Sequence, residues 1–202
     1  AIFFKDLISA LYGGKALLAF PEGPNMLSKL LLSKLGIHID YVKDPEGVCV
    51  EGLDYVILTD TCSIEQIGEF KRVLQSLPEL ESTLIVIDHH SPHESLALKA
   101  RIALIDEKAG STAEICYKVG KLVGYKPPLY VLELLVAGMV YDTRHFISAT
   151  PQTFKVMAEM VEADRSRSAH PVYFPTTLGI EALEEISTGR FPQQMRKTGR
   201  GS

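Results

Sequence analysis

The chain has 202 residues, of which 46% are hydrophobic and 23% charged, and its formal net charge is −4. These values are typical of a globular protein with one large domain or one and a half, and the acidic balance excludes a uniformly basic nucleic-acid binder. No apolar run approaches the roughly 20 residues that span a bilayer, and residues 1–6 lack the basic region of a secretory signal. The three scattered cysteines indicate reduced thiols. We therefore expect a cytoplasmic protein with no membrane partner.

Apolar periodicity predicts short strands that alternate with helices along the chain. The expected helices are residues 2–12, 26–35, 63–77, 111–123, 127–140, 151–163 and 178–186, and the expected strands are residues 15–20, 37–42, 55–60, 84–88 and 101–106. This alternation is typical of an α/β fold: a three-layer sandwich with a mostly parallel sheet of about five strands. Residues 1–163 would form this domain, and residues 164–202 would form a linker and the start of a C-terminal segment.

Two helix starts carry recognisable capping residues. Ser63 is followed three residues later by Gln66, which is a capping-box pattern. Ser111 is the expected N-cap of the helix at 111–123, and Thr112 is the alternative.

Acidic and imidazole side chains follow three of the apolar stretches. Asp60 ends the strand at 55–60, and Asp88-His89-His90 ends the run Leu84–Ile87; Asp142 follows a largely apolar helix. Ligands bind at the carboxyl ends of strands in open parallel sheets, and carboxylates with imidazoles suit Mn²⁺, Mg²⁺ or Zn²⁺. Such a site polarises a phosphoryl oxygen and generates hydroxide from bound water. The alternative is a solvated strand end at which the acid caps a turn.

Four segments, in this order and spacing, resemble the motifs of the DHH phosphoesterases, most closely the RecJ and nanoRNase branch. They are Val56–Asp60, Val86–His90, Gly110–Glu114, and Gly138–Phe146 with Thr150–Phe154. The superfamily also includes exopolyphosphatases and manganese-dependent inorganic pyrophosphatases.

The resemblance implies a role for each matching residue. Asp60 and Asp142 would bridge metals, His89 would bind metal, and His90 would face the substrate phosphate. Asp88 would orient the histidines by hydrogen bonding without itself binding the metal, a common role for a carboxylate.

The first motif of the family is degenerate in this chain. Leu18, Glu22 and Pro24 stand where the family has a histidine and two aspartates. Glu22 retains a ligand atom, whereas Leu18 and Pro24 have none. The remaining set predicts one Mn²⁺ (or Mg²⁺) ion rather than two, held by Asp60, His89 and Asp142 with Glu22 as a further ligand.

Other polar residues could serve the site or have simpler roles. Arg144 could meet a phosphate as a planar donor beside His145, or both could be solvated. His93 fits a solvated loop better than a ligand, and Cys62 fits packing as a small apolar residue.

Two functions follow from the resemblance. The first is a metal-dependent phosphoesterase that hydrolyses phosphodiester or nucleotide phosphate bonds, with single-stranded nucleic acid or a nucleotide as partner. Asp88, His90 and Arg144 would then serve catalysis. The second is a catalytically impaired scaffold in DNA replication or repair, like the RecJ relatives that dock with GINS and the MCM helicase. The glycine-rich second substrate-binding domain of the family is not found in these 202 residues.

Overall fold

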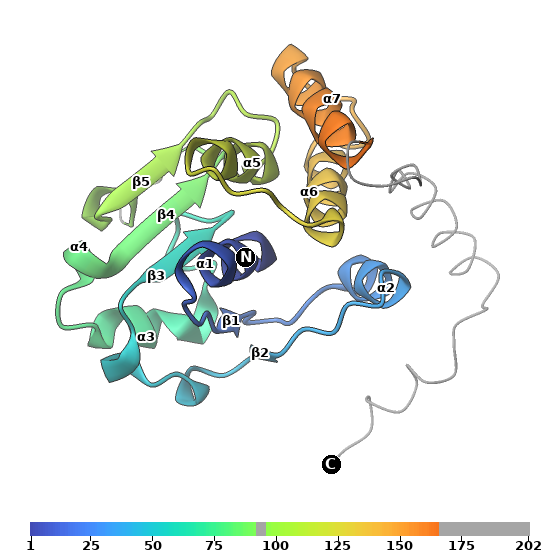
Figure 1. Ribbon diagram of the computed structural model, residues 1–202. Helices are drawn as coiled ribbons and strands as arrows, with labels where there is room; N and C mark the ends of the chain where they lie inside the picture. The colour runs from blue at the N-terminus through green and yellow to red at the C-terminus, as the bar shows by residue number, and fades with distance from the viewer. Residues whose placement is uncertain (92–95, 166–202) are drawn as a thin grey trace.

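A computed structural model describes residues 1–91 and 96–165 (Figure 1). Within these ranges twelve helices and strands are joined by short loops and 3₁₀ turns. In chain order they are α1 (Ile2–Tyr12), β1 (Leu18–Ala19), α2 (Met26–Lys34), β2 (Tyr41–Val42), β3 (Val56–Thr59), α3 (Lys71–Ser76), α4 (Leu80–Thr83), β4 (Leu84–Asp88), β5 (Ile102–Ile105), α5 (Thr112–Leu122), α6 (Leu129–Asp142) and α7 (Pro151–Arg165).

The strand pairs are parallel, as predicted, but the five strands form two sheets. One sheet has the order β3-β4-β5, with Leu58 opposite Val86 and Ile87 opposite Leu104. The other consists of β1 and β2 alone. These two strands are shorter than predicted, and the stretch before β1 buries little of its apolar surface: Leu17 is 53% exposed.

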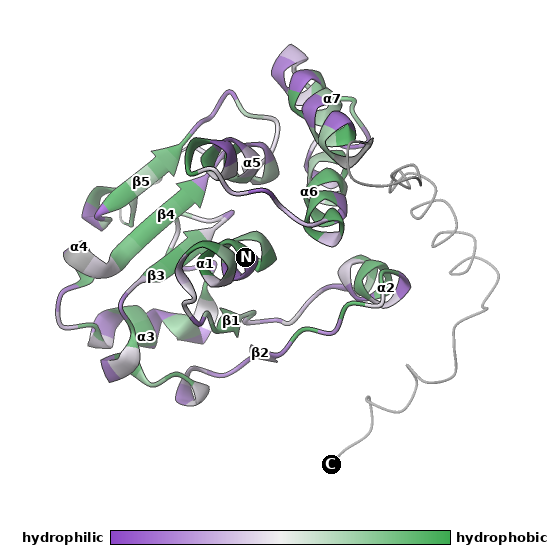
Figure 2. Ribbon diagram, in the orientation of Figure 1, coloured by the Kyte–Doolittle hydropathy of each residue, from purple (hydrophilic) through white to green (hydrophobic). Residues whose placement is uncertain are grey.

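The three-stranded sheet lies between two helical layers, so the predicted three-layer sandwich is confirmed. Side chains of β4 alternate between the two faces, as the strand period requires. Leu84 and Val86 pack with α3 on one face, whereas Ile85 and Ile87 pack with α1, α5, α6 and α7 on the other. Figure 2 shows β4 as hydrophobic along most of its length, which fits burial on both faces.

The prediction of a helix from Ser63 is wrong. The Ser63 hydroxyl donates to the Glu65 carboxylate, and Gln66 accepts from the Thr61 hydroxyl, so no capping box forms. Gly68 then adopts a positive φ of 55°, and the α-helix begins only at Lys71. By contrast, the prediction of Ser111 as the cap of α5 is confirmed, since its Oγ accepts from the Glu114 N–H at 3.3 Å.

The last helix, α7, extends two residues beyond its predicted end at Ala163. The helix predicted at 178–186, the rest of the predicted linker and His93 lie outside the described residues. In the part of the chain that the structure describes, no helix is both long and apolar enough to cross a membrane.

Candidate metal centre

Asp60 and the Asp88-His89-His90 segment lie side by side because β3 and β4 run parallel and end at the same edge. The Asp60 N–H donates to the Ile87 carbonyl oxygen at 3.0 Å, which continues the ladder one residue past β3. Asp60 has a φ of 65°, in the left-handed region. Aspartate tolerates this conformation better than most residues, and strained positions of this kind cluster at functional sites.

Four side chains at this edge could share one ion. Among the described residues, Asp60, Asp88, His89 and His90 each offer a ligand atom within 4.8 Å of the others. His89 Nε2 lies 3.7 Å from Asp60 Oδ1, and its Nδ1 lies 3.4 Å from the Ala109 carbonyl oxygen. When Nδ1 carries the proton and donates to Ala109, the Nε2 lone pair faces Asp60.

Asp88 is fully buried and anchors the turn that carries both histidines. Its Oδ1 accepts from the His89 N–H at 2.7 Å and the His90 N–H at 3.2 Å, and it lies 2.8 Å from His90 Nδ1. This hydrogen bond is the main reason that the pKa of His90 is raised. The His90 side chain is 60% exposed, so its other nitrogen remains accessible.

The second oxygen of Asp88 supports a cation at this edge. Oδ2 is buried and has no hydrogen-bond partner among the described residues. A buried carboxylate oxygen without a partner is costly, and a bound cation would compensate that cost. The oxygen and nitrogen donors that Asp60, Asp88, His89 and His90 bring together fit a divalent ion such as Mn²⁺ or Mg²⁺.

Asp142, the last residue of α6, lies outside the four-residue cluster but shares its electrostatic environment. Burial raises its pKa to about 6, and the negative charge of Asp60 adds to this effect. The nearby His89 and His90 act in the opposite direction. Asp142 is therefore coupled to both predicted metal ligands, Asp60 and His89.

The pKa of Asp142 predicts how metal binding depends on pH. Because an ion must displace the proton, the apparent Mn²⁺ affinity should fall about tenfold for each pH unit below about 6. In the absence of metal, the free energy of unfolding changes with pH in the opposite direction. The raised pKa of Asp142 stabilises the folded state at low pH, and this stabilisation is lost as the pH rises through about 6. Calorimetric titration of Mn²⁺ between pH 5 and pH 7 measures the first effect. Asp142→Asn should flatten the profile, and an equally steep profile in that variant would contradict the assignment.

Arg144 begins a left-handed turn two residues after Asp142. Arg144, His145 and Phe146 have φ values of 51°, 57° and 69°, which is unusual for three successive residues other than glycine. The turn is held by the buried Thr143, whose hydroxyl accepts from the Phe146 N–H at 3.1 Å. Arg144 and His145 are both exposed, so a phosphate could reach them.

The remaining predicted ligand, Glu22, is placed elsewhere. It is exposed and lines a hollow of about 520 Å³ that includes Lys43 and Gln66. It does not belong to the described cluster of ligand atoms. Leu18, at the histidine position of the first motif, is buried in β1 and offers no ligand atom.

Three contacts that position the site were missed in the sequence. Thr112 Oγ1 donates to Asp60 Oδ1 at 2.8 Å, the Ala109 carbonyl faces His89, and Glu114 binds the loop between them. The signal was present in the Gly-Ser-Thr-Ala-Glu segment, since Ser111 as cap leaves the Thr112 hydroxyl available to another acceptor.

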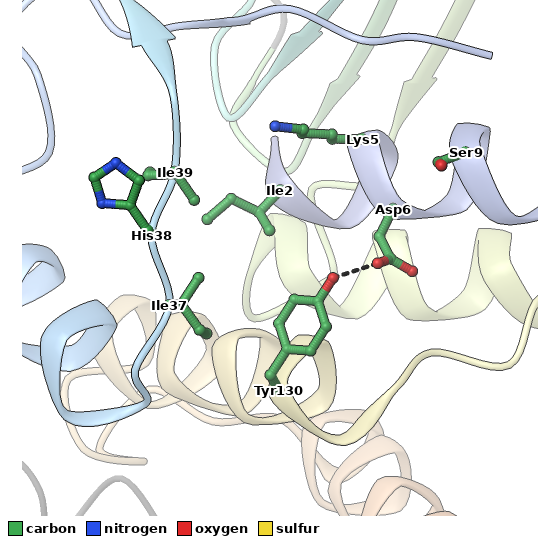
Figure 3. A pocket seen from close by; sticks show the side chains of 8 residues that line it. All are labelled: Ile2, Lys5, Asp6, Ser9, Ile37, His38, Ile39 and Tyr130. Atoms are coloured by element: carbon green, nitrogen blue, oxygen red, sulfur yellow. Dashed lines mark hydrogen bonds between the residues drawn. The ribbon is translucent and has the colours of Figure 1, made fainter. Parts of the chain in front are cut away.

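A second hollow, of about 380 Å³, lies between α1, α6 and the segment before β2. Figure 3 shows Tyr130 pointing at Asp6, which also accepts from the Tyr125 hydroxyl. Burial, together with this hydrogen bond, raises the pKa of Tyr130 to about 12. Ile2 and Ile37 line the apolar side of this hollow, and none of the predicted metal ligands lines it. The hollow is therefore distinct from the candidate metal centre.

Comparison with known proteins gives a family match over most of this domain. The model of the DHH family, N-terminal domain, matches residues 6–139. The match ends just before Asp142.

Two curated relatives match most of the chain. An uncharacterized protein of Methanocaldococcus jannaschii is 33% identical over 144 residues, covering 70% of this chain and 40% of that protein. A probable manganese-dependent inorganic pyrophosphatase of Streptococcus suis is 29% identical over 141 residues, covering 69% of this chain and 42% of that protein. The chain thus spans about two fifths of the length of these relatives.

A solved structure has the same fold. The crystal structure of an exopolyphosphatase-related protein from Bacteroides fragilis superposes with a TM-score of 0.63 at 18% identity. The superposition covers 80% of this chain and 47% of that one. At this identity the likeness establishes the fold alone.

Proposed function

This chain belongs to the DHH family, and we propose that it is the catalytic domain of a metal-dependent phosphoesterase. The observation that carries the proposal is the cluster of Asp60, Asp88, His89 and His90 at one sheet edge. Asp60, His89 and Asp142 would hold a single Mn²⁺ or Mg²⁺ ion. The manganese dependence in the name of the Streptococcus suis relative favours Mn²⁺.

When bound, the metal supplies Lewis-acid activation of a phosphoryl oxygen and of water. The chain supplies the rest. Asp88 fixes the His90 ring through Nδ1, so that a protonated His90 presents an N–H donor to the phosphate. The raised pKa of His90 increases the protonated fraction near neutral pH. Arg144 would add a second, planar set of donors that stabilises charge developing on the phosphoryl oxygens.

The proposed substrates are phosphodiester or nucleotide phosphate bonds in single-stranded nucleic acid or nucleotides, as in the RecJ and nanoRNase branch. The names of two similar proteins, a pyrophosphatase and an exopolyphosphatase-related protein, make phosphoanhydrides the competing substrate class. Both classes present tetrahedral phosphate to the same donors, so hydrolysis rates must separate them.

A second candidate is a catalytically impaired scaffold in DNA replication or repair. It is favoured by the first motif, where Leu18, which is buried, and Pro24 stand at positions that hold ligands in the family. Such a scaffold would bind replication proteins and would not need a metal.

Hydrolysis assays distinguish the two candidates. The protein is incubated with Mn²⁺ and either short single-stranded oligonucleotides or pyrophosphate. We expect oligonucleotide hydrolysis that falls at least about 100-fold in both His89→Ala and Asp142→Ala. His38→Ala is the matched control, because this side chain is 93% exposed and far along the chain from the cluster. Activity that survives both substitutions would come from a contaminant, and absence of both activity and Mn²⁺ binding would leave the scaffold.

A further inference from the structure

We propose that Glu114 is a positioning residue that fixes the His89 ring through the intervening Ala109–Gly110 peptide. This inference rests on the proposed metal site, since it concerns the ligand nitrogen that His89 presents there. Neither the matched motifs nor the cluster of ligand atoms assigns Glu114 a role in that site.

Glu114 is a fully buried acid in the first turn of α5. Its Oε1 accepts from the Gly110 N–H at 3.2 Å and from the Thr153 hydroxyl of α7. Its Oε2 is buried without a hydrogen-bond partner in the described part of the chain. A helix N-terminus favours a negative charge, but capping alone does not require an acid with a buried, unpartnered oxygen. Helix capping therefore does not account for Glu114 by itself.

The hydrogen bonds of one peptide unit connect Glu114 to His89. The Gly110 N–H and the Ala109 carbonyl belong to the same peptide group, whose N–H faces Glu114 and whose oxygen faces His89 Nδ1. The chain of contacts thus runs from a buried carboxylate, through a peptide, to the ring nitrogen opposite the metal-facing Nε2. It has the form of a carboxylate–histidine–metal triad with a peptide inserted in it.

The charge of Glu114 matters because hydrogen bonds in a chain polarise one another. A carboxylate at the N–H end makes the carbonyl oxygen at the other end a stronger acceptor. That acceptor favours the proton on Nδ1 of His89, which leaves Nε2 as the lone-pair nitrogen toward Asp60. An uncharged group at position 114 would keep the contact but weaken this preference.

Packing prevents the loop from relaxing away from His89. A Cβ on Gly110 would come within 2.7 Å of Thr153 Oγ1, 3.0 Å of Glu114 Oε1 and 3.1 Å of Thr143 Cγ2. The same first turn of α5 carries Thr112, which donates to Asp60. The first turn of α5 therefore supports both predicted ligands: Glu114 holds the loop whose carbonyl faces His89, and Thr112 donates to Asp60.

The test uses nitrogen NMR of the histidine rings in the full chain without metal, in mildly alkaline buffer. We expect His89 in the wild type to carry its proton mainly on Nδ1. Glu114→Gln, which keeps the shape but not the charge, should shift His89 toward the Nε2–H form. In a separate calorimetric titration it should weaken Mn²⁺ binding about tenfold.

Thr153→Val is the matched control for lost packing and hydrogen bonding. It removes the other hydrogen bond to Oε1 but leaves the carboxylate facing Gly110. Both variants should lower the melting temperature by roughly 2–4 °C, whereas only Glu114→Gln should change the His89 tautomer.

Two outcomes would overturn the inference. One is a wild-type His89 that carries its proton on Nε2, a result that needs no variant to fold. The other is an equal change of tautomer in both variants, which would assign Glu114 a purely structural role. Neither outcome depends on hydrolysis, so failure here is distinguishable from failure of the proposed function.

Discussion

Asp60→Asn is expected to weaken Mn²⁺ binding by about 100-fold while leaving the fold intact. Asparagine keeps an oxygen to accept the Thr112 hydroxyl and tolerates the left-handed backbone, whose φ is 65° at this position. The substitution therefore removes mainly the negative charge that faces His89 Nε2. Calorimetric titration with Mn²⁺ at pH 7.5 measures the loss, and far-UV circular dichroism checks the fold.

Asp106→Asn is the matched control for Asp60. Asp106 follows β5 as Asp60 follows β3, but its carboxylate pairs with Lys118 at 3.5 Å. Asp106→Asn should leave the Mn²⁺ affinity unchanged.

Asp60→Asn should also lower the pKa of Asp142, because the negative charge of Asp60 contributes to raising that pKa. Equal Mn²⁺ affinities in the two variants would remove Asp60 from the site.

Leu84→Ala is expected to destabilise the folded domain by about 2–5 kcal/mol. Leu84 begins the central strand, is 0% exposed and packs in the apolar cluster under α3. Because β4 hydrogen-bonds to both β3 and β5, a cavity at Leu84 would weaken the packing of the strand that joins the other two. A loss of this size is a large fraction of the roughly 5–15 kcal/mol that stabilises a typical domain. Urea unfolding followed by circular dichroism measures it.

The same substitution at Leu98 provides the comparison. Leu98 is 85% exposed, so Leu98→Ala should change the free energy of unfolding by less than about 0.5 kcal/mol. Similar losses in the two variants would mean that β4 is not the buried centre of the sheet.

The central sheet could be predicted well because its signals are local. The run Leu84–Ile87 is apolar throughout and rich in β-branched residues, and the strand is found at Leu84–Asp88. The capping role of Ser111 is likewise decided by its immediate neighbours. These features need no knowledge of distant parts of the chain.

Prediction failed where other contacts override the local pattern. The spacing at Ser63 favours a capping box, but Thr61 and Glu65 compete for the same side chains and Gly68 turns the chain. The apolar stretch before β1 has the composition of a buried strand, yet Leu17 stays half-exposed in the fold.

The sequence indicated which acids and histidines would meet at the sheet edge, but it did not indicate the groups that hold them in place. Acids and histidines at predicted strand ends can be expected to lie close together, because parallel strands bring their carboxyl ends to the same edge of the sheet. The Ala109 carbonyl is not distinctive in the sequence until folding places it opposite His89. The Thr112 hydroxyl is left available by the Ser111 cap, but the sequence does not indicate that its acceptor is Asp60. Glu22 has the right chemistry, but in the fold it lines a hollow that contains none of the other predicted ligands.

Calorimetric titration of Mn²⁺ into the wild-type chain at pH 7.5 tests most directly whether this sheet edge is a metal site. We predict that one ion binds per chain and that binding is lost in a variant that lacks both His89 and Asp142. Absence of Mn²⁺ binding, or binding that this double variant retains, would contradict the assignment.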